Sequence, residues 1–171
     1  MNDQKHLSDI IYQRHPPKVW DAAAIPANQQ QILLVDDDCG ITDSLAGVLT
    51  EEGFVVFAAA NGAEALDIAN KFPVDLVILD LNMPVKNGWD TFERFSAEHP
   101  LVPVIVATAR PNQLFTALGA GVGALMEKPL EIPQLLKTIR RLLAESNITR
   151  LRRLVGQETP FEYRPSIKGS R

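Results

Sequence analysis

The sequence predicts an α/β fold with a doubly wound, five-stranded parallel sheet, and three observations lead to this prediction. Short apolar runs of strand length recur five times between residues 32 and 145. Amphipathic segments with helical spacing lie between them. Several of the runs end on polar or charged side chains. Strands that alternate with helices form parallel sheets covered on both faces through right-handed crossovers. We therefore expect three layers, α/β/α.

The elements follow one another in regular order. Gly53 ends the first helix, Asn61 can cap the second, and Pro103 is tolerated because it begins a strand. The expected strands are 32–35, 54–57, 74–79, 102–107 and 124–127. The expected helices are 41–52, 63–71, a segment after Gly88, 113–118 and 132–144.

Composition limits the class of protein. A chain of 171 residues is long enough for one domain with a core, and 46% hydrophobic and 22% charged residues are typical of soluble globular proteins. The single cysteine, Cys39, excludes an intrachain disulfide and a four-cysteine metal site. No apolar run approaches the roughly 20 residues of a membrane span, and the first residues lack a signal-peptide core. We therefore expect a cytoplasmic protein.

Charge divides the chain into three parts. Residues 1–31 are expected to form a flexible N-terminal extension. Residues 32–145, the α/β domain, hold 8 Lys+Arg and 16 Asp+Glu, a balance of 8 − 16 = −8. Residues 146–171 hold 6 Lys+Arg and 2 Glu, a balance of 6 − 2 = +4. This basic C-terminal extension keeps helical spacing to about Val155, so we interpret it first as a continuation of the last helix, and otherwise as a partner-binding peptide.

Five polar side chains stand at strand ends. Asp36 and Asp37 follow the first strand, Asp80 the third, Thr108 the fourth and Lys128 the fifth. The carboxyl ends of parallel strands meet at one edge of the sheet. Three close carboxylates need a cation to stay ionised, and their oxygens suit Mg²⁺. A lysine and a threonine beside them can bind phosphoryl oxygens.

This set suits phosphoryl transfer onto Asp80, with Lys128 and Thr108 stabilising the transferred group. Each residue alone has an ordinary interpretation: a helix cap, a surface charge or a packing residue. If no site existed, five such residues would have to stand at the right strand ends by coincidence.

Four motifs carry a resemblance to a known family. ILLVDDD, VILDLNMPVKNG, VIVATA and MEKPL occur in this order between residues 32 and 145. Together they resemble the receiver domain of two-component response regulators, of the stand-alone type. The resemblance implies a flavodoxin-like (CheY-like) sheet of strand order 2-1-3-4-5. It also implies that the Lys128-Pro129 peptide bond is cis.

The resemblance implies roles and partners as well. Asp80 would be the phosphoacceptor, in a signalling domain that catalyses only its own phosphorylation and dephosphorylation. A histidine kinase or histidine phosphotransfer protein would supply the phosphoryl group, and an unknown downstream protein would receive the signal. No membrane or nucleic-acid contact is expected, and a homodimer through the last helix is left open. Mg²⁺, the implied cofactor, would be bound by Asp36, Asp37, Asp80 and the backbone carbonyl of Asn82.

Two departures from the family pattern affect the output. Leu125 stands where the family usually has an aromatic residue, three positions before Lys128. The gap from Thr108 to Lys128 is 128 − 108 = 20 residues, shorter than usual, which predicts a short fourth helix. We expect the signal to leave by a non-standard surface. The alternative is a pseudo-receiver, an interaction scaffold that is not phosphorylated. A phosphatase of the aspartyl-nucleophile type is disfavoured, because Asn82 stands where it needs a second acid.

Overall fold

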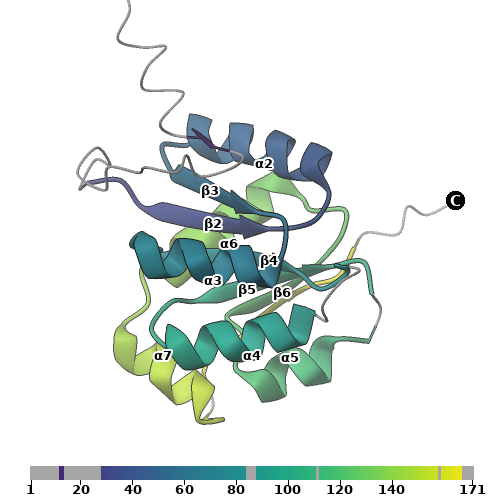
Figure 1. Ribbon diagram of the computed structural model, residues 1–171. Coiled ribbons are helices and arrows are strands. Elements are labelled where there is room, and N and C mark those ends of the chain that lie inside the picture. Colours follow the sequence, from purple (N-terminus) through teal and green to yellow (C-terminus); the bar gives the residue numbers. More distant parts are fainter. Residues whose placement is uncertain (1–11, 14–27, 84–87, 111, 158, 167–171) are drawn as a thin grey trace, which may run out of the picture.

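The computed structural model describes residues 12–13, 28–83, 88–110, 112–157 and 159–166. At its centre lies a parallel sheet of order β1-β3-β2-β4-β5-β6-β7 (Figure 1). The five central strands have the predicted order 2-1-3-4-5, which is confirmed. One short strand that the sequence did not predict is added at each edge. The strands are β1 (Tyr12–Gln13), β2 (Gln31–Val35), β3 (Val55–Ala59), β4 (Leu76–Asp80), β5 (Val104–Thr108), β6 (Ala124–Glu127) and β7 (Glu162–Arg164).

Helices connect the strands close to the predicted positions. Asn61 caps its helix as predicted, since its side chain accepts a hydrogen bond from the Glu64 backbone N–H. Asp38 caps the first described helix in the same way, by accepting from Gly40 and Ile41. The fourth predicted helix is short, as expected. The helices are α2 (Cys39–Glu51), α3 (Gly62–Lys71), α4 (Gly88–Glu98), α5 (Leu114–Ala120), α6 (Ile132–Leu143) and α7 (Asn147–Leu154).

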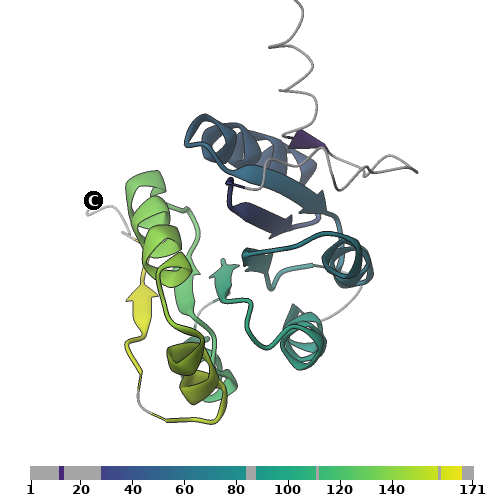
Figure 2. The same ribbon diagram turned by 90° about the vertical axis from the view of Figure 1, so that its left-hand side faces the viewer.

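Two apolar cores hold the layers together. Alternate strand residues such as Leu33 and Val106 pack under α3, α4 and α5. Their neighbours along the strands, such as Leu34 and Ile105, pack under α2 and α6. Both faces of the central strands are buried, which explains their continuous apolar runs. The three-layer α/β/α arrangement is confirmed (Figure 2).

The chain after α6 differs from the predicted helix continuation. The α6 helix ends at Leu143, and a new helix begins at Asn147, where the Ser146 hydroxyl accepts a hydrogen bond from Thr149. Serine favours this cap position because it satisfies a free backbone N–H group. The Arg150 guanidinium then donates to the Leu101 carbonyl over 2.8 Å. The α7 helix therefore packs near the amino end of β5.

Several expectations fall outside the described residues. These include most of the expected N-terminal arm with its apolar residues Ile10, Ile11 and Trp20, and the loop 84–87. From the arm, Tyr12 and Gln13 pair with Val56 and Phe57. Within the described parts of the chain, no helix combines the length and the apolar character that a bilayer crossing requires.

Candidate functional site

The sheet register brings the predicted strand-end residues to one edge. Val35 pairs with Leu79 on the neighbouring strand. Asp36 and Asp80, the next residues along each strand, therefore lie side by side. Asp80 itself pairs with Ala107, one residue before Thr108. Lys128 comes directly after β6, and its bond to Pro129 is cis, as the resemblance implied. All of these positions lie at carboxyl ends of strands.

Three carboxylates and a lysine are in close contact there. One oxygen from each of Asp36, Asp37 and Asp80 lies within 4.8 Å of the others. The Lys128 ammonium donates to Asp36 Oδ2 over 2.7 Å and to Asp80 Oδ2 over 2.9 Å. Asp80 is only 4% exposed, whereas Asp37 is open to solvent. The lysine thus balances much of the charge of the two more buried acids.

Backbone N–H groups orient these two acids. The Asp38 N–H donates to Asp36 Oδ1, and the Asn82 N–H donates to Asp80 Oδ1, each over 2.9 Å. In both carboxylates, Oδ1 is therefore bound by the following loop and Oδ2 by Lys128. Two fixed oxygens hold each carboxylate in one orientation, which prepares the site for a directional reaction.

The charge state of Lys128 follows from these contacts. Burial alone would lower the pKa of the Lys128 ammonium, but the hydrogen bonds and charges of Asp36 and Asp80 outweigh it and hold that pKa above its ordinary value. Lys128 is therefore a permanent cation near neutral pH. It can therefore stabilise negative charge at Asp80 while it stays protonated.

Thr108 is placed differently from the acids. It is fully buried, and its hydroxyl oxygen accepts a hydrogen bond from the Arg110 backbone N–H over 3.0 Å. Its carbonyl accepts from the Lys128 N–H over 2.9 Å. In this structure the threonine joins Lys128 through the backbone, and its hydroxyl orients the loop after β5. A hydroxyl that accepts in this way still has its own proton to donate.

The acid cluster fits a hard divalent cation. Carboxylate oxygens on three side chains, one of them solvent-exposed, match the donors that Mg²⁺ prefers and leave room for bound water. Asp36, Asp37 and Asp80 are the residues that could hold the ion. The cluster is thus consistent with Mg²⁺ binding.

Sequence reasoning missed three residues beside the site. Glu127 precedes Lys128, and its carboxylate accepts hydrogen bonds from Tyr163 and Ser166 in the C-terminal segment. The segment FEYR, between Pro160 and Pro165, carries aromatic residues that favour a strand. That signal could have indicated β7.

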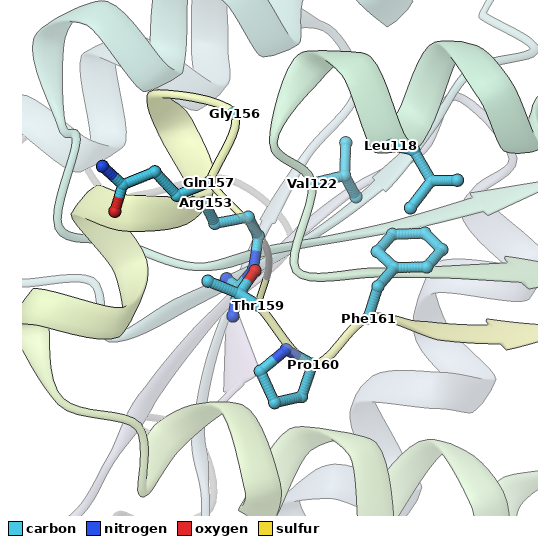
Figure 3. Close-up of a pocket in the computed structure, with 8 residues that line it drawn as sticks. All are labelled: Leu118, Val122, Arg153, Gly156, Gln157, Thr159, Pro160 and Phe161. Atoms are coloured by element: carbon cyan, nitrogen blue, oxygen red, sulfur yellow. The ribbon is translucent and has the colours of Figure 1, made fainter.

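Two surface cavities lie beside the C-terminal segment. One of about 570 Å³ lies beside the candidate site, between the loop after β5 and the C-terminal segment. A second, of about 480 Å³, lies between α5, α7 and the segment before β7 (Figure 3). Only the first has Lys128 in its wall. The second is remote from the acid cluster, as none of the three acids lines it.

A doubly wound sheet of this order with such a strand-end cluster defines a class of signalling domain. The family model of the response regulator receiver domain matches residues 32–140, so the chain belongs to this family. Receiver domains are signalling domains of two-component systems rather than enzymes in the ordinary sense.

Individual relatives support this membership. The transcriptional regulatory protein CpxR of Escherichia coli (strain K12) is 41% identical over 119 residues, which cover 68% of this chain and 50% of CpxR. CreB of the same organism, also a transcriptional regulatory protein, is 34% identical over 117 residues, covering 67% and 51%. The chain thus spans about half the length of the curated relatives that it matches.

Solved structures agree with the fold. A response regulator receiver domain protein (CheY-like) from Methanospirillum hungatei JF-1 has a TM-score of 0.64 and 30% identity, covering 68% of this chain and 94% of that one. The response regulator TrrA from Thermotoga maritima, solved in complex with Mg(2+)-BeF, has a TM-score of 0.62 and 28% identity, covering 67% and 99%.

Proposed function

We propose that this chain is a response regulator that accepts a phosphoryl group on Asp80. The observation that carries the proposal is the position of Lys128, whose ammonium bridges Asp36 and Asp80 at 2.7 and 2.9 Å. This arrangement places a permanent cation at the carboxylate that would react. It also leaves the three acids grouped for one divalent ion.

The reaction joins an Asp80 carboxylate oxygen to phosphorus. The bond between phosphorus and the donor breaks, and its electron pair leaves with the donor: a histidine nitrogen of a kinase or phosphotransfer protein, or the acetate of acetyl phosphate. Mg²⁺ held by Asp36, Asp37, Asp80 and the Asn82 carbonyl would offset the negative charge that gathers there. Lys128 would donate hydrogen bonds to the phosphoryl oxygens, and the Thr108 hydroxyl can donate another.

We also propose where the protein acts and what it acts on. A soluble receiver domain meets its kinase in the cytoplasm, which is where we place this protein. We propose a downstream protein as the target, without a name for it. The expectation that nucleic acid plays no part has no support, because the curated relatives are transcriptional regulatory proteins. The homodimer stays a prediction; Ile148 and Leu151 on α7, with Val155 directly after it, are exposed apolar residues that could serve it.

The test is an intact mass measurement after incubation with acetyl phosphate and Mg²⁺. We expect the wild type to gain one phosphoryl group and Asp80→Asn to gain none. Asp67→Asn, a change of the same kind at an exposed site on α3, serves as the matched control and should be phosphorylated normally. Omission of Mg²⁺ should abolish the gain.

A phosphoryl group that is hydrolysed rapidly would escape the mass measurement, so a separate binding experiment is needed. Fluoroberyllate with Mg²⁺ mimics the phosphorylated state without hydrolysing. If the wild type neither gains mass nor binds fluoroberyllate, the chain is a pseudo-receiver and the proposal fails.

A further inference from the structure

The last described segment runs along the sheet edge beside the candidate site. β7 pairs in parallel with β6, with Leu125 opposite Tyr163 and Met126 opposite Arg164. β6 leads directly into Lys128, so this segment lies against the strand that positions the lysine. We refer to residues 159–166 as the strap.

The first part of the strap is anchored independently of the site. The Phe161 ring packs on the apolar core and lies next to Leu118 and Val122 (Figure 3). One residue later, the Arg141 guanidinium donates to Glu162 Oε2 over 3.0 Å. An aromatic anchor and an ion pair therefore fix the beginning of the strap to α5 and α6.

The second part of the strap is held by Glu127. The Tyr163 hydroxyl donates to Glu127 Oε1 over 2.6 Å. Ser166 donates to Glu127 Oε2 twice, from its backbone N–H over 3.1 Å and from its hydroxyl over 3.3 Å. These three hydrogen bonds converge on one carboxylate, so a shift of that carboxylate disturbs all of them together.

Glu127 is also tied to the candidate site through the backbone. It pairs with Thr108 in the sheet, and its neighbour Lys128 donates to the Thr108 carbonyl over 2.9 Å. The cavity of about 570 Å³ separates Glu127 and Tyr163 from Ala109 and Gln113 of the next loop. Glu127 and Lys128 therefore line the same cavity.

We propose that the strap is a gate on the β6 edge, and that its second part is released when Asp80 carries a phosphoryl group. The inference rests on the proposed function. A phosphoryl group concentrates three acceptor oxygens and up to two negative charges in one group, whereas each of the two carboxylates that Lys128 now bridges carries a single charge. As Lys128 turns to these oxygens, it displaces Glu127, the adjacent residue, from Tyr163 and Ser166.

Release has a defined structural result. The backbone groups of Leu125 and Met126 lose their partners in β7, while Phe161 and the Arg141–Glu162 pair keep the strap tethered. An unpaired strand edge is a surface to which another extended segment can add. Coupling between two sites is reciprocal, so weakening the strap must also favour the loaded form of Asp80.

Hydrogen exchange of the Tyr163 and Arg164 amides in the full chain tests the gate. We compare the protein alone, with Mg²⁺, and with Mg²⁺ and fluoroberyllate. Fluoroberyllate should speed this exchange about two- to tenfold, the range expected for the loss of a hydrogen bond. Tyr163→Phe, which removes only the hydroxyl, should already exchange faster without ligand and should bind fluoroberyllate more tightly.

Glu127→Gln and a matched control complete the design. Glu127→Gln should resemble Tyr163→Phe, because a neutral amide is a weaker acceptor than a carboxylate. Glu52→Gln removes a carboxylate that pairs with Arg140 on the surface, away from the strap, and should behave as the wild type.

The two proposals fail in different ways. If ¹⁹F NMR shows fluoroberyllate bound while β7 exchange is unchanged or slower, the gate is overturned and the proposed function stands. Equal fluoroberyllate affinity in Tyr163→Phe and the wild type also overturns the gate. If the wild type neither binds fluoroberyllate nor gains a phosphoryl group from acetyl phosphate, both proposals are overturned.

Discussion

The Lys128 ammonium offsets part of the negative charge of the acid cluster, as a bound cation would. Its ammonium contacts Asp36 and Asp80, whereas Asp37 lies within 4.8 Å of both acids and faces solvent. Asp37 is therefore the acid whose charge is least compensated in the metal-free protein. It is also the acid that water and an incoming ion reach most easily.

The Asp37→Asn variant should separate stability from metal response. Removing a repelling charge is expected to stabilise the metal-free protein slightly, by ~0.5 kcal/mol. Added Mg²⁺ raises the melting temperature of any protein that binds it only in the folded state, and this rise should be lost in the variant. Thermal melts with and without Mg²⁺ measure both effects. A variant less stable than the wild type without metal would show that the acids do not repel.

Gly88 permits the close approach of α4 to the end of β4. A Cβ atom built there would lie 2.6 Å from the Leu81 Cα and 2.8 Å from the Asp80 carbonyl oxygen. Gly88→Ala should therefore destabilise the fold by ~1–3 kcal/mol, because backbone atoms must shift. Gly47→Ala in α2 is the control: nothing lies within 4 Å of its added Cβ, so a gain of ~0.5–1 kcal/mol is expected. Urea unfolding compares the two; equal effects would contradict the argument.

At the scale of elements, the strap depends on charge as well as on backbone pairing. Burial alone would raise the pKa of the Glu162 carboxyl, but hydrogen bonds from Arg164, Arg141 and Thr138 outweigh it and hold that pKa below its ordinary 4.5. The folded pKa is thus lower than the unfolded one. The contribution of Glu162 is complete above about pH 4.5 and is lost as pH falls through the folded pKa.

Acid should therefore loosen β7. We expect the NMR signals of Tyr163 and Arg164 to report a change that develops only as pH falls below 4.5, the ordinary glutamate pKa. Glu162→Gln has no carboxyl to titrate at this position and should lack that change. If the variant and the wild type follow the same pH profile, another group controls the strap.

At the scale of the whole molecule, sequence patterns predicted the central sheet and the grouping of the acids because both depend on long apolar runs and strand ends. The edge strands were missed because runs of two and three residues carry little periodic signal. The separate α7 was missed because its helical spacing continues across Ser146. The contacts of Glu127 depend on tertiary packing that brings residues 39 positions apart together.

The two edge strands have a consequence for solubility. β1 and β7 cover the outer strands of the five-stranded core, and both lie outside residues 32–140, the part that matches the family model. A chain cut to 32–140 would carry two open strand edges, which act as templates for pairing with other molecules. Sedimentation should show that this fragment self-associates with rising concentration more strongly than the full chain does. The segments that contain β1 and β7 would then protect the chain from aggregation by covering these edges.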